Sequence, residues 1–262
     1  MATRPSATAR TGFHTEASFG LATACLNCGS PLTGAYCAEC GQRAVDLAAP
    51  IWLVLKEAMT DAIDVDGRAF RTARALGAPG RLTTEFLSGR RAPYLGPVKL
   101  FLLAGTLLTT TWIVTRGIDS HYYHLSVDSA AGAYIDRVVR GSLAAGMAIA
   151  VSSWLLALGR RRFMDDVVFA LHLVATLTLW ATAVIWIGTA WKIMWGTAAA
   201  TPPRLPALPF LLFLPAAVVG CAYIGSSVRR VYGGPWWAMA LRTLLITAAG
   251  IAAVIAIISH TV

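Results

Sequence analysis

The stretch VVFALHLVATLTLWATAVIWIGTAW, residues 167–191, contains no Asp, Glu, Lys or Arg. A helix needs about 20 predominantly apolar residues to cross the hydrocarbon core of a bilayer, so this stretch predicts a transmembrane helix. For one such stretch alone, a buried helix of a soluble protein is the alternative. Four further apolar stretches are long enough to span, at residues 97–115, 141–159, 207–226 and 236–259. Five in succession favour a membrane bundle over a soluble core.

The composition of the whole chain agrees with lipid as its solvent. Of its 262 residues, 56% are hydrophobic and 13% are charged, whereas a soluble domain carries about 25% charged residues. The mean hydropathy is +0.62. We therefore expect an all-α membrane protein with a five-helix transmembrane bundle over residues 97–262.

Basic residues are distributed unevenly among the loops between these stretches. One set of loops holds Arg160, Arg161, Arg162, Arg229 and Arg230, and eleven Lys or Arg lie before or at the start of the first stretch. The opposite loops hold Arg116, Arg137, Arg140, Lys192 and Arg204. Because Lys and Arg favour the cytoplasmic side of a bilayer, we expect a multi-pass protein with its N-terminus in the cytoplasm and its C-terminus outside.

Four of the five cysteines lie in CLNCGSPLTGAYCAECGQ, residues 25–42, as two Cys-x-x-Cys pairs. Disulfides are disfavoured in the cytoplasm, so the pairs predict a tetrahedral metal site. Its ligands would be Cys25, Cys28, Cys37 and Cys40. Four sulfur ligands with no open position are typical of structural Zn²⁺, and we expect a small zinc ribbon over residues 21–46, after a flexible tail at 1–20. A rubredoxin-like iron centre and thiol redox chemistry use the same residues and are the alternatives.

A ribbon of about twenty residues cannot build a hydrophobic core, so a bound metal would supply its folding free energy. Gly29 and Gly41 directly follow the two cysteine pairs. We expect them to adopt backbone conformations that other residues resist, which would turn amides toward the thiolates. The fifth cysteine, Cys221, is expected to pack within the fourth stretch as a small apolar residue.

Residues 47–96 are too polar to span a bilayer and too apolar for a simple linker. A first amphipathic helix is predicted from the helical spacing of Trp52, Leu55, Met59 and Ile63. A second is expected over about residues 67–76, with one face formed by Arg68, Arg71 and Arg74 and the other by Phe70, Ala73 and Leu76. A third is expected over about residues 82–88.

These helices are expected either to lie in the cytoplasmic interface, with their arginines toward anionic headgroups, or to pack on the cytoplasmic end of the bundle. Both arrangements would offer a basic surface to lipid or to a protein partner. That surface would comprise Arg68, Arg71, Arg74, Arg90, Arg91 and Tyr94.

The stretch VDGRAFRTARALGAPGRLTTEFLSGRRAPYLGPVKLF, residues 65–101, resembles the core signature of a bacterial membrane family, domain of unknown function 3667. The residues that fit are Asp66, Gly67, Thr72, Pro79, Gly80, Phe86, Gly89, Arg91, Tyr94 and Pro97. The cysteine stretch is similar to the ribbon that commonly precedes this signature. The chain departs from the pattern at Gly77 and Ala78, where an Arg or Lys is usual nearby. The resemblance implies the architecture, a bacterial origin and no known reaction. In a bacterial inner membrane, the C-terminus placed outside by the basic residues would lie in the periplasm.

Titratable residues within membrane spans are candidates for function. Asp165 and Asp166 begin the third stretch, His172 lies a few residues into it, and Arg242 lies in the fifth. All four are expected in the cytoplasmic half of the bundle, where they could form a polar cluster that binds a headgroup, relays a proton or locks helices together. The structural alternatives are helix capping by the aspartates, a hydrogen bond from His172 to Ser or Thr of a neighbouring helix, and snorkelling of Arg242 to the interface.

The chain contains no nucleophile elbow, phosphate loop, dinucleotide fingerprint or zinc-protease motif, so we assign no catalytic residues and favour a protein that is not an enzyme. The net charge of +9 is explained by the loops, and without a nucleic-acid-binding signature no nucleic-acid partner is expected. The leading hypothesis is an interaction, scaffold or regulatory protein that docks a protein partner or anionic lipid, or forms a homo-oligomer. The alternatives are a transporter or channel subunit and electron transfer through an iron ribbon.

Overall fold

The structure, a computed structural model, describes residues 24–44, 67–123, 131–156, 162–196 and 207–258. The chain forms two compact units, residues 1–49 and 50–262. The predicted amphipathic helix around Trp52 and Met59 lies outside the described residues. Within them are seven helices and no strand beyond two isolated bridges, which confirms the all-helical prediction.

The first unit contains a four-cysteine module, residues 24–44, built from two similar turns. In the first, the amide of Cys25 donates to the carbonyl of Ser30 at 2.8 Å, and the amide of Gly29 donates to the carbonyl of Cys25 at 2.8 Å. The second turn repeats this pattern between Cys37 and Gln42. Gly29 and Gly41 have φ angles of 79° and 68°, a region that glycine enters without steric cost, so the prediction for these glycines is confirmed.

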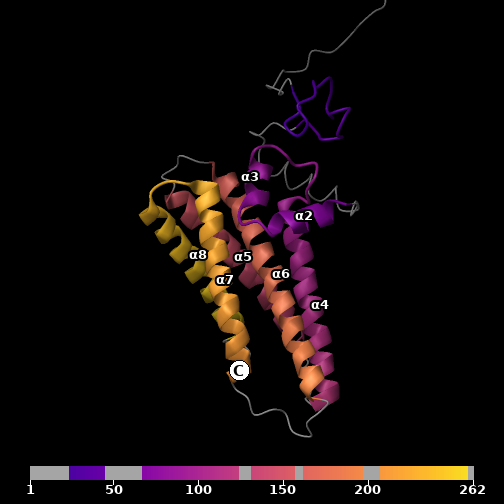
Figure 1. The fold of residues 1–262 in the computed structure, drawn as a ribbon, viewed down its shortest axis with the longest axis vertical. Helices are drawn as coiled ribbons and strands as arrows, with labels where there is room; N and C mark the ends of the chain where they lie inside the picture. The colour runs from indigo at the N-terminus through magenta and orange to yellow at the C-terminus, as the bar shows by residue number, and fades with distance from the viewer. Residues whose placement is uncertain (1–23, 45–66, 124–130, 157–161, 197–206, 259–262) are drawn as a thin grey trace, which may run out of the picture. The chain divides into compact units, whose positions relative to one another are not determined.

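The second unit is dominated by five long helices (Figure 1). They are α4 (Pro97–Tyr123), α5 (Ala131–Leu156), α6 (Phe163–Gly196), α7 (Ala207–Tyr232) and α8 (Trp236–Ile258). Among the described residues, three helical segments are long and apolar enough to cross a membrane: Pro97–Ile118, Val138–Leu156 and Phe163–Trp191. Trp236–Ala252 is a shorter apolar segment. Three candidate spans are thus confirmed, and the count of five stays a prediction.

Two short helices, α2 (Arg68–Leu76) and α3 (Arg81–Leu87), precede the bundle. They pack where α4 and α6 begin and α7 ends (Figure 1). We call this end of the bundle the capped end, and residues 67–96 the helical cap. The cap belongs to the same compact unit as the bundle, so packing on the bundle, one of the two arrangements expected from the sequence, is observed.

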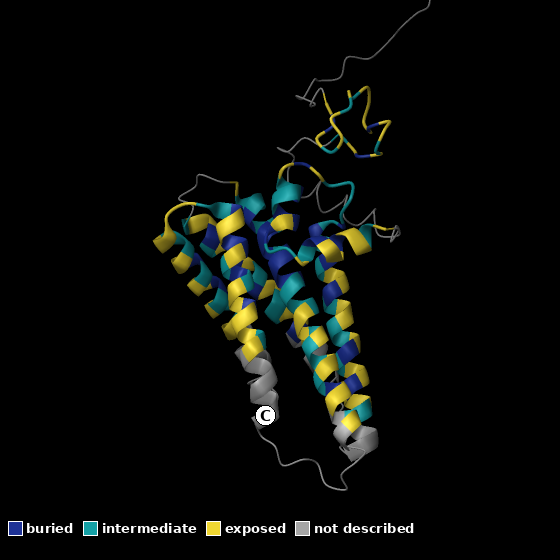
Figure 2. Ribbon diagram, in the orientation of Figure 1, coloured by how far each residue is buried: buried dark blue, intermediate teal, exposed yellow. Residues whose placement is uncertain are grey.

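The helices of the bundle pack around small and branched apolar side chains. The main core contains Ile149 of α5, Phe169 of α6, Val228 of α7 and Ile246 of α8. The second cluster joins the cap to α4 and α6 through Ala75, Leu82, Leu100, Ala104 and Ala175. Many large apolar side chains remain exposed, including Leu102, Met147, Ile187, Val218 and Leu244, and Figure 2 shows exposed positions recurring along all the long helices. Such extensive apolar exposure is typical of helices that face lipid.

The face by which α2 contacts the protein differs from the face that the sequence suggested. Thr72 and Ala75 are buried, whereas Phe70 is 75% exposed and Ala73 is also exposed. The spacing of Phe70, Ala73 and Leu76 indicated the apolar side of the helix, but the narrow contact with the bundle is made by small residues that allow close approach. Phe70 is therefore left outside the protein core.

Candidate functional site

The four cysteines of the module converge. Their sulfur atoms all lie within 4.8 Å of one another, and the Sγ atoms are 3.6 Å apart for Cys25 and Cys40 and 3.5 Å apart for Cys28 and Cys37. A tetrahedral ion with metal–sulfur bonds of about 2.3 Å has sulfur–sulfur edges of about 3.8 Å. The geometry therefore fits one ion held by four thiolates.

Hydrogen bonds prepare two of these sulfurs to carry charge. The side chain of Ser30, and then its backbone amide, lower the pKa of Cys28 to about 6. The side chain of Asn27 lowers the pKa of Cys40, and the amide of Gln42 assists. Ser30 and Gln42 directly follow Gly29 and Gly41. The left-handed glycines thus turn the next amides toward the sulfurs, as a ligand cradle requires.

Cys37 shows the opposite tendency. Its hydrogen bond from the backbone of Cys40 lowers the pKa, but desolvation and the thiol hydrogen bonds to Cys28 and Cys40 raise it, and the result is about 11. Adjacent thiols share protons because neighbouring thiolates repel each other. A bound cation would remove this conflict by stabilising all four thiolates.

Cys221 takes no part in the cluster. It lies in α7, within the fourth stretch, and its side chain is exposed rather than packed against the described helices. A position on one face of a single apolar helix does not reveal whether that face meets protein or lipid.

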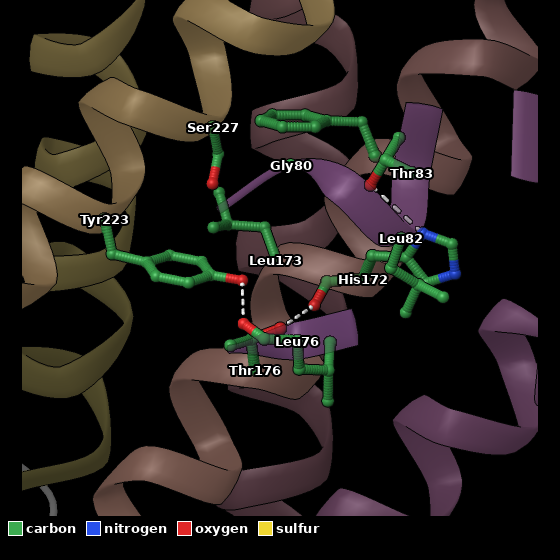
Figure 3. Close-up of a pocket in the computed structure, with 10 residues that line it drawn as sticks. Leu76, Gly80, Leu82, Thr83, His172, Leu173, Thr176, Tyr223 and Ser227 are labelled. Carbon is green, nitrogen blue, oxygen red and sulfur yellow. Dashed lines mark hydrogen bonds between the residues drawn. The ribbon is translucent and has the colours of Figure 1, made fainter. Parts of the chain in front are cut away.

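The helical cap is attached to the bundle by its α2–α3 turn, where Gly80 has a φ angle of 70°. A Cβ atom at this position would stand 3.0 Å from the carbonyl oxygen of Ser227. Two side chains of α7 donate to cap carbonyls: Tyr223 Oη to Leu76 at 2.9 Å and Arg230 Nη1 to Pro79 at 3.1 Å. The turn is therefore held directly against α7, and Figure 3 shows the part of this contact around Tyr223.

Hydrogen bonds also hold the cap together internally. Thr72 Oγ1 donates to the carbonyl of Arg68 at 2.7 Å and accepts from the amide of Leu95 at 2.9 Å, which ties α2 to the segment before α4. Tyr94 Oη donates to Glu85, and Arg81 Nε lies 2.7 Å from the other carboxylate oxygen of Glu85. Thr72 and Tyr94 are among the residues on which the family resemblance rests, and the structure gives them these roles.

His172 of α6 is buried beneath the cap. Its Nδ1 lies 3.1 Å from Thr83 Oγ1 (Figure 3), and its ring meets Phe86 edge to face with centroids 5.5 Å apart. Arg91 lies over the ring of Phe86, with its Cζ 4.9 Å from the ring centroid. The hydrogen bond to a Thr of a neighbouring helix is the structural alternative that the sequence left open.

A small cavity adjoins His172. Polar side chains that line it include Thr83, Thr176, Tyr223 and Ser227 (Figure 3). The centre of a water molecule can occupy about 10 Å³ of this cavity. The cavity therefore has room for about one water. The cavity can hydrate buried polar groups, but it is too small to receive a substrate.

Asp166 and Arg242 meet through a third residue, Tyr232 of α7. Tyr232 Oη donates to Asp166 Oδ1 at 2.6 Å, and Arg242 Cζ lies 4.4 Å from the centre of the Tyr232 ring. Asp166 is fully buried and Arg242 is 7% exposed. Snorkelling of Arg242 is thus wrong for this structure, because its side chain is covered by the bundle.

The polar cluster expected from the sequence is therefore only partly formed in the structure. Asp166 and Arg242 share Tyr232, whereas His172 belongs to the contact with the cap. In the described part of the chain, no side-chain hydrogen bond or ion pair joins half-buried Asp165 to either group. The sequence did not single out Tyr232 or Thr83, because neither side chain is charged. Their partners, Asp166 and His172, each lie more than sixty residues away in the chain.

The predicted basic surface is only partly accessible. Arg71, Arg74 and Arg90 are exposed, whereas Arg68, Arg91 and Tyr94 are half-buried. Arg91 and Tyr94 are engaged with Phe86 and Glu85 inside the cap. The exposed arginines are therefore the ones available to a ligand.

The chain matches no curated protein and no solved structure. Its residues 66–109 match the family described as protein of unknown function (DUF3667). The matched segment covers the helical cap and the first part of α4. It includes Gly80 and Phe86, which contact the bundle, and Thr72, which ties α2 to the segment before α4. Over this segment the chain is thus similar to the DUF3667 family of unknown function.

Proposed function

We propose that the protein is a docking or regulatory protein of the bacterial inner membrane, whose zinc-bound four-cysteine module and basic cap engage a protein partner or anionic lipid in the cytoplasm. The observation that carries this proposal is the convergence of Cys25, Cys28, Cys37 and Cys40 within 4.8 Å. A closed four-sulfur site has no position for a substrate, so it is suited to a structural role.

The polar groups of the bundle support docking more than transport. The cavity beside His172 has room for about one water. The Asp166–Tyr232–Arg242 contacts join three helices, as a structural lock would. A transporter or channel subunit therefore remains the weaker alternative, and flux across proteoliposomes would be the observation in its favour.

The proposal is tested on the full chain purified in mild detergent. We expect about one zinc per chain by elemental analysis, no visible absorbance of the kind that iron–thiolate centres give, and a co-purifying partner in stoichiometric amount. The double variant Cys25→Ser/Cys37→Ser should lose both metal and partner, whereas Cys221→Ser should keep both. Recovery of the same proteins with wild type and double variant would rule out docking through the module.

Orientation is tested separately in cells. The cytoplasmic placement predicts that a thiol reagent unable to cross the inner membrane leaves Cys25–Cys40 unlabelled until the membrane is permeabilised. Labelling of these cysteines in intact spheroplasts, with a chelator present to free the thiols, would place the module outside and refute the proposal.

A further inference from the structure

We infer that the capped end of the bundle binds the headgroups of anionic phospholipids through exposed arginines grouped around the helical cap. This inference deepens the proposed function and rests on its cytoplasmic placement of the cap, and it names the ligand of a surface separate from the four-cysteine module. The surface, which we call the basic rim, comprises Arg71, Arg74, Arg81, Arg90, Arg229 and Arg230, all exposed.

The first support is charge. The described carboxylates at the capped end are those of Glu85, Asp165 and Asp166. Glu85 is engaged by Arg81 and Tyr94, and Asp166 is fully buried. Among the residues that the structure describes, the rim therefore carries an excess of positive charge. At the opposite end, exposed Arg140 is already paired with Asp136.

The second support is the way that the α2–α3 turn positions Arg230. One guanidinium nitrogen of Arg230 donates to the carbonyl of Pro79 at 3.1 Å. The Cβ of Arg230 stands 3.3 Å from where a Cβ of Gly80 would be, and Arg81 directly follows Gly80 in the chain. A guanidinium has five N–H donors. One contact to Pro79 thus orients the group while leaving donors that suit the oxygens of a phosphate.

The third support is a set of exposed aromatic rings on the same unit. Phe70 lies beside Arg71 in α2 and is 75% exposed, and Trp236 and Trp237 begin α8 with exposures of 78% and 59%. The first turn of α8 follows the last turn of α7, which carries Arg229 and Arg230. Aromatic rings beside basic side chains at a helix end are typical of the headgroup level of a bilayer.

A lipid explains this combination better than a soluble acidic partner does. Trp237 shares one exposed face of α8 with Leu241 and Leu244, because these residues are spaced at i, i+4 and i+7 and are 59%, 38% and 65% exposed. A ligand that pairs a negative headgroup with an apolar tail would meet both parts of the surface at once.

The test uses the full chain reconstituted into nanodiscs of phosphatidylcholine, with or without a minor share of phosphatidylglycerol. The readout is the enrichment of phosphatidylglycerol among lipids that stay bound after detergent extraction, measured by mass spectrometry. The variant is Arg74→Gln/Arg90→Gln/Arg229→Gln, which leaves the contacts of Arg81 and Arg230 intact. The matched control at the opposite end is Arg116→Gln/Arg140→Gln.

We expect wild type and control to enrich phosphatidylglycerol over phosphatidylcholine. The rim variant should show a roughly tenfold smaller enrichment, because each basic residue near the membrane surface adds to the attraction for anionic lipid. Raising the salt concentration should weaken the enrichment, since exposed charges are screened. Unchanged melting temperatures of the variants would show that the fold is intact.

Equal enrichment by wild type and the rim variant would overturn the inference, and so would an equal loss in the control. A rim variant that keeps the lipid but loses a co-purifying protein would overturn it in favour of a protein-binding surface. The Cys25→Ser/Cys37→Ser variant separates the two proposals, because it should lose metal and partner while its phosphatidylglycerol enrichment stays as in wild type.

Discussion

The two units of this chain differ in how many apolar side chains they bury. In residues 24–44, the buried apolar side chains are Cys25 and Cys37, with exposures of 4% and 2%, so the module buries little beyond its own ligands. The bundle instead buries large side chains such as Phe169 and Ile246, each 1% exposed. The comparison predicts that one region depends on a bound ion and the other on packing, and that perturbing one should leave the other folded.

Removal of the metal should produce the largest effect. Cys25→Ser/Cys37→Ser, or treatment with a strong chelator, should unfold the module, because structural zinc contributes roughly 10–16 kcal/mol of apparent binding free energy to small four-ligand domains. Proteolysis within residues 24–44 and the metal content measure this loss. The melting transition of the bundle should stay where it is. A bundle that unfolds together with the module would break the comparison.

Truncation of the bundle core should have the next largest effect. Phe169→Ala removes a fully buried ring and should cost about 3–5 kcal/mol, seen as reduced resistance to unfolding in detergent. Leu244→Ala is the matched control, because Leu244 is 65% exposed and its loss creates no cavity. Metal content should be unchanged in both variants. Equal destabilisation by the two substitutions would show that the packing described for α6 and α8 is incorrect.

The third largest effect on stability is expected from removing polar contacts within the bundle. Tyr232→Phe removes the hydroxyl that donates to buried Asp166 and should cost about 1–3 kcal/mol, because a buried carboxylate loses one partner. Tyr223→Phe removes the bond to the Leu76 carbonyl and the hydroxyl's contacts with Thr176 and Ser227, all uncharged partners, and should cost about 0.5–1.5 kcal/mol. The order of the two unfolding midpoints checks this prediction, which a lower midpoint for Tyr223→Phe would contradict.

The turn of the cap is sensitive to a single methyl group. Gly80→Ala should destabilise the attachment of the cap by about 1–2 kcal/mol, because alanine resists a positive φ angle and its Cβ would press on Ser227. Faster proteolysis between α2 and α4 is the expected readout. Gly105→Ala in α4 is the control, since nothing lies within 4 Å of its added Cβ. Resistance equal to wild type in both variants would refute the close contact.

Acid should loosen the cap by the smallest amount. Burial raises the pKa of Glu85, but its hydrogen bonds with Tyr94 and Arg81 lower the pKa by more than burial raises it. The pKa of Glu85 is therefore below its ordinary value of 4.5. Because the pKa of Glu85 is lower in the folded chain, its contribution to stability is complete above its pKa in the unfolded chain. That contribution is lost as the pH falls through its pKa in the folded chain. Protection of the cap from proteolysis should therefore weaken only below about pH 4.5, and Glu85→Gln should remove this pH dependence. A loss beginning near neutrality would identify another group.

The comparison also shows which features could be predicted. The clustering of the four cysteines, the left-handed glycines after them and the helical character of the described parts of residues 97–258 follow from local chemistry and spacing. The face of α2 and the grouping of Asp166, His172 and Arg242 do not, because they depend on which neighbour each helix face meets. Thr72 and Ala75 carry no strong pattern, yet they form the contact by which α2 packs on the protein.

The amino-acid sequence by itself determined the cysteine cluster and the long apolar helices, since Cys-x-x-Cys pairs and long apolar runs act through neighbours close in the chain. Only the tertiary structure decided that Tyr232 joins Asp166 to Arg242, that His172 lies under Thr83, and that the turn at Gly80 is attached to α7. The physical reason is that hydrogen bonds and close packing between distant segments depend on orientations to within an ångström. Periodicity along a chain does not specify such orientations.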